Sequence, residues 1–174
     1  MLVTGPPGAG KTTIARALAD DLGLPLLEKD TLKEVIGGAL GITDRAQSQR
    51  LGGAVFDVMA AIAHDLLSRR VSLIAEGNFK PDSRILEHPP ARVLQVHVTA
   101  APEALRARLA ARDRHGVHYD REAAAEIAAR AAAGEWGPIP LEADLVELDT
   151  TAGFPDPHEV AQLVQRWTSR FSSS

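Results

Sequence analysis

The sequence has 174 residues and a mass of 18.5 kDa, which matches one globular domain and leaves no room for a second independent core. A hydrophobic share of 45% with 24% charged residues excludes a disordered, collagen-like or coiled-coil chain. The formal net charge of -4 disfavours nucleic acid and anionic membranes as general partners. Because cysteine is absent, disulfides, thiolate metal sites and cysteine nucleophiles are excluded.

The first four residues lead directly into a glycine-rich segment, with no charged leader or apolar signal segment ahead of them. No run reaches the roughly 20 apolar residues that span a bilayer. We therefore expect a cytoplasmic protein without a membrane partner.

Short apolar runs alternate with helical patterns along the whole chain. The runs cover residues 1–4, 24–27, 71–75, 93–98 and 145–148, and the helical patterns cover 11–21, 32–40, 47–69, 102–112, 121–133 and 158–170. The runs show little polar alternation, which is typical of strands covered on both faces. The alternation predicts an α/β fold with a parallel sheet.

A phosphate-binding motif joins the first run to the first helix. The segment Gly5-Pro6-Pro7-Gly8-Ala9-Gly10-Lys11-Thr12 matches G-x-x-x-x-G-K-[ST] between a strand and a helix, as that motif requires. Backbone amides of the loop and the positive end of the helix would hold phosphate groups. Lys11 would reach the β and γ phosphates and Thr12 would bind Mg²⁺, while Thr13 completes the predicted nucleotide-binding set.

The nucleotide is predicted to be ATP because a guanine-specific segment is missing. Guanine-specific P-loop proteins resemble one another in an N-K-x-D motif late in the chain. Asn78 is the only asparagine here, and it is followed by Phe-Lys-Pro-Asp.

Two acids follow the second and third runs, where ligands of open α/β sheets bind. Asp30 is the candidate to position and deprotonate an acceptor hydroxyl, and Glu76 the candidate to hold Mg²⁺ through a water molecule. Other interpretations stay open. Asp30 or Thr31 could cap the next helix through the capping-box pattern of residues 31–34, and Glu76 could be an acid that faces solvent. Lys33 could face the acceptor or be a solvated helix lysine.

Positive charge is concentrated between residues 104 and 116, where four arginines stand against Asp113 alone. On a helix, Arg108 and Arg112 lie four residues apart beside the buried stripe. We predict that they clamp the ATP phosphates or the adenine. The alternative is a solvated helix face that pairs with nearby acids.

The chain resembles the small P-loop kinases of the adenylate kinase-like group, nearest the branch that holds chloramphenicol phosphotransferase, zeta toxins and polynucleotide 5′-kinases. The resemblance is carried by the motif of residues 5–12, by Asp30-Thr31-Leu32-Lys33 matching D-x-x-[RK], by Glu76-Gly77-Asn78-Phe79-Lys80-Pro81, and by R-x-x-x-R from Arg108 to Arg112. It implies a three-layer fold with a five-stranded parallel sheet of order 2-3-1-4-5 and ATP with Mg²⁺ as phosphoryl donor.

The same resemblance implies one kinase domain over residues 1–174, with acceptor-side helices at about 31–70 and a lid at about 113–136. Asp30, Lys33, Asn78 and Lys80 are the acceptor-contacting candidates. Monophosphate kinases carry an acceptor-binding arginine where residues 32–40 offer only Lys33. This difference favours an acceptor with a free hydroxyl group.

We therefore predict an ATP-dependent kinase that phosphorylates a hydroxyl of a small molecule such as a nucleoside, a sugar or an antibiotic. One alternative is a polynucleotide 5′-hydroxyl kinase. It needs a basic track, whereas residues 30–70 hold five basic and five acidic side chains. The other is a switch protein that hydrolyses ATP and has little use for Asp30. The acceptor and the oligomeric state stay undetermined.

Overall fold

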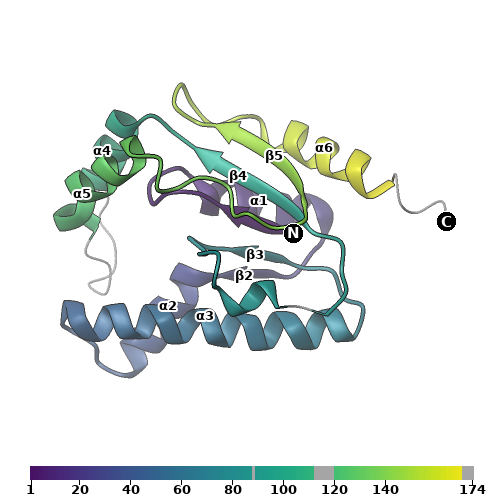
Figure 1. Cartoon of the computed structure of the whole chain (residues 1–174), viewed down its shortest axis with the longest axis horizontal. Helices are drawn as coiled ribbons and strands as arrows, with labels where there is room; N and C mark the ends of the chain where they lie inside the picture. The colour runs from purple at the N-terminus through teal and green to yellow at the C-terminus, as the bar shows by residue number, and fades with distance from the viewer. Residues whose placement is uncertain (88, 112–119, 170–174) are drawn as a thin grey trace.

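Five parallel strands form one sheet in the order β2-β3-β1-β4-β5 (Figure 1). The computed structural model describes residues 1–87, 89–111 and 120–169. The strand order and the parallel pairing confirm the predicted α/β fold. The strands are β1 (Leu2–Thr4), β2 (Leu26–Glu28), β3 (Ile74–Glu76), β4 (Leu94–Thr99) and β5 (Asp144–Asp149).

The helices follow the predicted succession, with one difference that matters for the site. The α-helices are α1 (Lys11–Leu22), α2 (Lys29–Ala39), α3 (Arg45–Ser68), α4 (Pro102–Ala110), α5 (Asp120–Ala132) and α6 (Pro157–Ser169), and a short 3₁₀ helix, η1 (Arg84–Leu86), was not predicted. Helix α2 begins three residues before the predicted start, directly after β2. Asp30 therefore lies in its first turn.

Two hydrophobic cores cover the two faces of the sheet, and β1 contributes to both. Val3 packs into a core with Ile14 and Leu18 of α1 and with Val160 and Val164 of α6. Its neighbour Leu2 packs into the other core, which α3 and η1 cover with side chains such as Val55, Met59 and Ile85. Successive side chains of a strand point to opposite faces, so a strand buried on both faces reads as a continuous apolar run.

The carboxyl ends of the five parallel strands lie at the same edge of the sheet. In Figure 1 the strand arrows point to the end of the molecule where α4 and α5 lie together. The glycine-rich loop, the start of α2 and the end of β3 meet at this edge, because parallel strands bring their carboxyl ends together.

Helix α3 is the one helix, among the residues that the structure describes, that is long and apolar enough to cross a membrane by length and composition. One side of it packs Leu51, Val55 and Met59 into the core, while Asp57 and Asp65 are exposed on it. This pattern is that of a core helix lying on a sheet. The absence of a membrane partner stays a prediction.

The phosphate loop, which is the segment of residues 5–10 between β1 and α1, packs closely against the sheet at Gly5. Its φ is 133°, and a Cβ added there would overlap the carbonyl oxygen of Val98 in β4. Gly5→Ala should therefore lower the free energy of unfolding by at least about 2 kcal/mol, measured by urea denaturation. Gly53→Ala is the matched control, since that helical glycine of α3 has open space around it. The control should raise stability by about 0.5–1 kcal/mol. Equal effects of both substitutions would contradict this account.

Candidate active site

The phosphate loop and the first turn of α1 form a concave backbone surface. Gly8 and Gly10 have φ values of 88° and 93°, so the chain turns twice in the left-handed region before the helix. Gly10 is the N-cap of α1 and supplies no side-chain hydrogen bond to the helix. The amides of the first turn therefore have no capping side chain, and the positive end of the helix dipole faces the loop. Both features suit an anion.

Lys11 and Glu76 form the charged floor beside this loop. The Lys11 ammonium donates to the carbonyl oxygen of Pro6 at 3.0 Å and lies 3.9 Å from Oε1 of Glu76. Only 8% of Lys11 and 3% of Glu76 are exposed. Oε2 of Glu76 is buried and has no hydrogen-bond partner among the described residues.

Burial raises the pKa of Glu76 above its usual value, and the negative charges of Asp30 and Glu28 raise it further, against the opposing effect of Lys11 and Lys29. A buried carboxylate with one unsatisfied oxygen is a costly group in a folded protein. It is the kind of group that a bound cation would stabilise.

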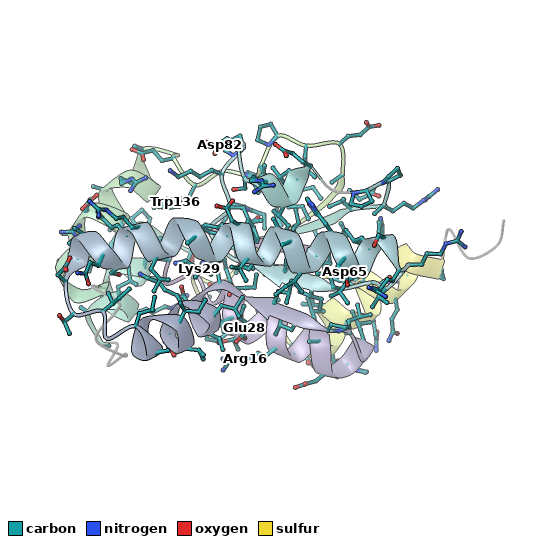
Figure 2. All side chains as sticks on the ribbon, turned by 90° about the horizontal axis from the view of Figure 1, so that it is seen from below. Arg16, Glu28, Lys29, Asp65, Asp82 and Trp136 are labelled. Atoms are coloured by element: carbon teal, nitrogen blue, oxygen red, sulfur yellow. The ribbon has the colours of Figure 1, made fainter. Side chains whose placement is uncertain are left out.

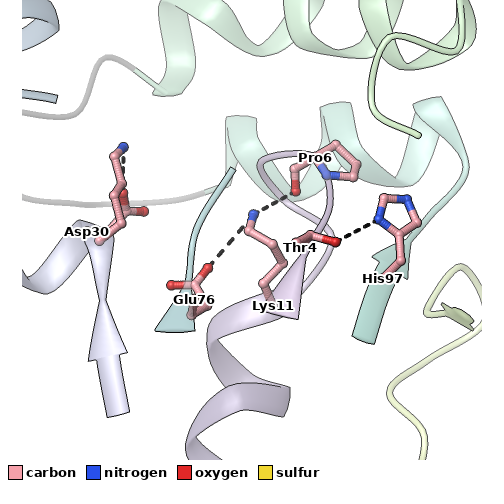
Figure 3. A network of polar contacts seen from close by, with 7 residues as sticks. Thr4, Pro6, Lys11, Asp30, Glu76 and His97 are labelled. Atoms are coloured by element: carbon pink, nitrogen blue, oxygen red, sulfur yellow. Dashed lines mark hydrogen bonds and ion pairs between the residues drawn. The ribbon is translucent and has the colours of Figure 1, made fainter. Parts of the chain in front are cut away.

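One pocket brings together the loop and both predicted acids. It is lined by Pro7, Gly8, Gly10, Lys11, Thr12, Lys29, Asp30, Glu76, Gly77 and Asn78. In Figure 3, Asp30 and Lys11 lie on opposite sides of Glu76. The predicted solvent-facing alternative for Glu76 is therefore wrong, since its carboxylate is buried in this pocket.

Asp30 carries an ion pair that the sequence did not indicate. The ammonium of Lys29 donates to Oδ1 of Asp30 at 3.0 Å. Capping does not explain Asp30, because Glu28 is the N-cap residue and makes no side-chain capping bond. The alternative that Thr31 caps the helix is also wrong, since Thr31 lies inside the helix and its hydroxyl donates to Oε2 of Glu28.

Glu28 is the buried anchor of this corner. It accepts hydrogen bonds from Nε and Nη2 of Arg16 at 2.6 and 2.9 Å, and a third from Thr31. Figure 2 shows Arg16 and Glu28 next to each other below the ribbon of α3, close to Lys29. Burial by itself raises the pKa of Glu28, but the hydrogen bonds from Arg16 and Thr31 outweigh it and lower the pKa overall. The network ties α1 to the turn that holds Asp30.

The other predicted loop and acceptor residues divide into separate places. Thr13 is exposed on α1 and does not line the pocket. Lys33 is 8% exposed, so the solvated-lysine alternative is wrong, but it does not line the pocket either. Asn78 lines the pocket and also a second one, where it is joined by Lys80, Arg130 and Trp136.

Arg108 lies against the outer side of the phosphate loop. Its guanidinium donates to the carbonyl oxygen of Gly8 at 3.4 Å and to Oγ1 of Thr150 at 2.9 Å, and it lies 5.3 Å from the centroid of the Phe154 ring. The solvated-face alternative is wrong for Arg108, because its guanidinium packs against the phosphate loop, Thr150 and the Phe154 ring. Arg112 and residues 113–119 of the predicted lid lie outside the described residues.

A buried polar chain supports the loop from the other face of the sheet. The Thr4 hydroxyl is 3.0 Å from Nδ1 of His97 and 3.2 Å from Oε1 of Gln95. Gln95 in turn bonds both the amide and the carbonyl oxygen of Ile139. Burial lowers the pKa of His97, which is 1% exposed. His97 is thus a core residue of β4 that helps to fix the end of β1 (Figure 3).

The Arg16–Glu28 pair gives a pH-dependent prediction. Arg16→Met leaves a buried carboxylate with fewer donors, so at pH 7 it should lower the free energy of unfolding by about 1 kcal/mol, a modest figure because Arg16 is largely exposed. Because folding lowers the pKa of Glu28, this stabilisation is present above the usual value of 4.5 and is lost as the pH falls through the folded value. The difference between the variant and the wild type should therefore shrink below about pH 4.5.

The matched control is Arg69→Met. Arg69 also donates two hydrogen bonds to a carboxylate, that of Asp65, but both of these side chains are exposed. Asp65 lies toward the other end of α3 (Figure 2). Denaturant titrations from pH 3 to 8 should show a much smaller effect of the control. An equal effect of both substitutions at every pH would refute the role given to Glu28.

Comparison with known proteins places this site in a family. The model of the family described as "AAA domain" matches residues 1–134. Over a short stretch of 47 residues, the chain is 45% identical to the replication factor C large subunit of Methanococcus aeolicus, which covers 22% of this chain and 10% of that protein. The chain therefore spans far less than two thirds of this curated relative.

Solved structures agree over nearly the whole chain. A "putative kinase" from Chloroflexus aurantiacus is 30% identical with a TM-score of 0.76, and the match covers 95% of each chain. A sugar kinase from Janibacter sp. HTCC2649 is 20% identical with a TM-score of 0.63, covering 97% of this chain and 92% of that one. A gluconokinase from Sinorhizobium meliloti is 18% identical with a TM-score of 0.59, covering 99% and 96%. The last two similarities establish the fold alone. The chain belongs to the AAA domain family AAA_33 and has the fold of the P-loop kinases.

Proposed function

We propose that this protein is an ATP-dependent kinase that transfers the γ-phosphoryl group to a hydroxyl of a small molecule. The proposal rests on one observation: Lys11, Asp30 and Glu76 line the same pocket at the positive end of α1. Kinase names among proteins of the same fold support it. The finer resemblance to the chloramphenicol phosphotransferase branch adds the expectation that the acceptor group is an alcohol.

The loop and the first turn of α1 hold the nucleotide in this proposal. Lys11 neutralises charge on the β and γ phosphates, and Arg108 lies beside the loop near the nucleotide. Thr12 and Glu76 hold Mg²⁺, which supplies charge neutralisation when it is bound with ATP. The buried unpartnered oxygen of Glu76 fits a hydrated cation.

The described residues contain no cluster of three or more His, Asp or Glu side chains arranged for a metal. Mg²⁺ commonly takes one or two protein oxygens and completes its shell with phosphate oxygens and water. Thr12 and Glu76 match that mode of binding.

Asp30 faces the nucleotide from the acceptor side. The acceptor oxygen attacks the γ-phosphorus while the bond from that phosphorus to the β–γ bridging oxygen breaks, and ADP leaves with the electron pair. Asp30 orients the hydroxyl and accepts its proton. The rest of the acceptor is proposed to lie in the adjoining pocket, which Asn78 shares with the phosphate pocket and which Lys80 and Trp136 also line.

Acceptor-dependent turnover is the direct test of this function. ADP production should be measured with MgATP alone and with pooled nucleosides, sugars, sugar acids, shikimate and hydroxylated antibiotics. A kinase should consume ATP faster with one of the pools, and mass spectrometry should then find a phosphorylated product. Turnover that no pool changes would favour the ATP-hydrolysing switch.

Asp30→Asn should reduce phosphoryl transfer by about 10²-fold while leaving the affinity for MgATP nearly unchanged, because the amide keeps the shape but cannot accept the proton. Initial rates and calorimetry measure the two quantities. Lys11→Ala is the contrast, since it should weaken both binding and turnover. Full transfer activity in Asp30→Asn would remove this residue from the mechanism.

Glu76→Gln should raise the Mg²⁺ concentration needed for half-maximal turnover by about 10-fold, a typical loss when a group that holds a metal through water is replaced. A Mg²⁺ titration at saturating ATP measures it. Thermal unfolding should check that the variant folds, because the substitution removes the charge that lies 3.9 Å from the buried Lys11 ammonium. An unchanged Mg²⁺ midpoint would contradict the metal role of Glu76.

A further inference from the structure

Lys29 lines the pocket that also contains Lys11, Asp30 and Glu76, and the proposed function gives it no role. It is the second lysine that lines the pocket, and it lies beside Asp30, whereas Lys11 begins α1 directly after the phosphate loop. Its side chain is only 15% exposed. A solvated helix lysine would be far more accessible than this.

The position of Lys29 is fixed by packing as well as by charge. Its ammonium lies 6.0 Å from the centroid of the Phe56 ring of α3, as well as 3.0 Å from Asp30. A Cβ placed on Gly77 would lie 3.3 Å from Cβ of Lys29 and 3.1 Å from Cε1 of Phe56. Because residue 77 is a glycine, the side chain of Lys29 has room to pack against the end of β3.

The charged residues that line the pocket bear on the role of Lys29. Lys11, Lys29, Asp30 and Glu76 are the charged lining residues, two of each sign. Lys29 acts electrostatically on Glu76 as well as on Asp30, so its charge is felt across the pocket. A γ-phosphoryl group between the loop and Asp30 would face the negative charges of both acids. One cation on each side of it offsets that repulsion.

We propose that Lys29 is a further catalytic residue that contacts the oxygens of the transferring phosphoryl group from the acceptor side. The inference rests on the proposed kinase function. An ammonium has three donors, and one of them points at Asp30. The others are available in this arrangement to non-bridging oxygens of a phosphoryl group moving from ADP to the acceptor oxygen held by Asp30. The proton of the acceptor hydroxyl goes to Asp30, and Lys29 exchanges no proton in this step.

The test compares two nucleotides that differ by the γ group. Calorimetry should measure the affinities of Lys29→Met for MgADP and for the magnesium complex of the non-hydrolysable β,γ-imido analogue of ATP. The variant should bind the analogue about 10-fold more weakly, the loss of one charge-assisted hydrogen bond, and should bind MgADP as the wild type does. Lys29→Arg should restore most of the affinity.

The same substitution made in the Asp30→Asn protein shows whether Lys29 contacts the γ group itself or only holds Asp30 in position. If Lys29 touches the γ group, Lys29→Met should weaken the analogue about 10-fold in Asp30→Asn protein as well. If it acts only through Asp30, the substitution should have no effect in that background, and the proposal is overturned. Equal losses for MgADP and the analogue, or no loss at all, overturn it too.

Two controls keep the result interpretable. Arg106→Met removes an exposed cation of α4 and should change neither affinity. Thermal unfolding should confirm that each variant folds, with Lys29→Gln replacing the methionine variant if that one does not. A wild-type protein that binds neither nucleotide would refute the proposed function itself, which is a different outcome from a failure of Lys29.

Discussion

An almost fully buried carboxylate beside the phosphate loop is the constraint around which the pocket is organised. Removing Glu76 from water is costly, and no donor among the described residues satisfies its second oxygen. Its negative charge is balanced by Lys11 at 3.9 Å and, further away, by Lys29. Glu76 lies beside the loop because the parallel pairing of β1 and β3 brings their carboxyl ends to the same edge. The free protein therefore already holds the electrostatic field that a magnesium nucleotide would meet.

Local sequence patterns predicted the parts of the site that depend on backbone alone. Gly5 to Thr12 could be placed because glycine spacing, a preceding strand and a following helix are all short-range features. Asp30 and Glu76 could be brought to one edge because a parallel sheet requires it. The strand order agreed with the order implied by the resemblance.

The directions in which the side chains of the site point could not be predicted from the sequence. In the sequence Lys29 follows a strand as an ordinary charged residue, whereas in the structure it begins α2 and lines the pocket. The Arg16–Glu28 pair joins two elements separated by a turn, and no periodicity reports which exposed arginine reaches a buried acid. Lys33 was ambiguous for the same reason, since its burial depends on how α2 lies against α3 and β2.

Thr150 has a mechanical consequence. Its hydroxyl oxygen accepts from Arg108 and lies 2.8 Å from the carbonyl oxygen of Ala9 and 3.0 Å from that of Thr99, so segments far apart in the chain meet at one atom. Arg108 of α4 is thereby hydrogen-bonded both to the phosphate loop and to Thr150, the residue that follows β5. These hydrogen bonds join α4 to the phosphate loop through Thr150 and Arg108, so we expect the two elements to keep the same relative position whether or not the pocket is filled.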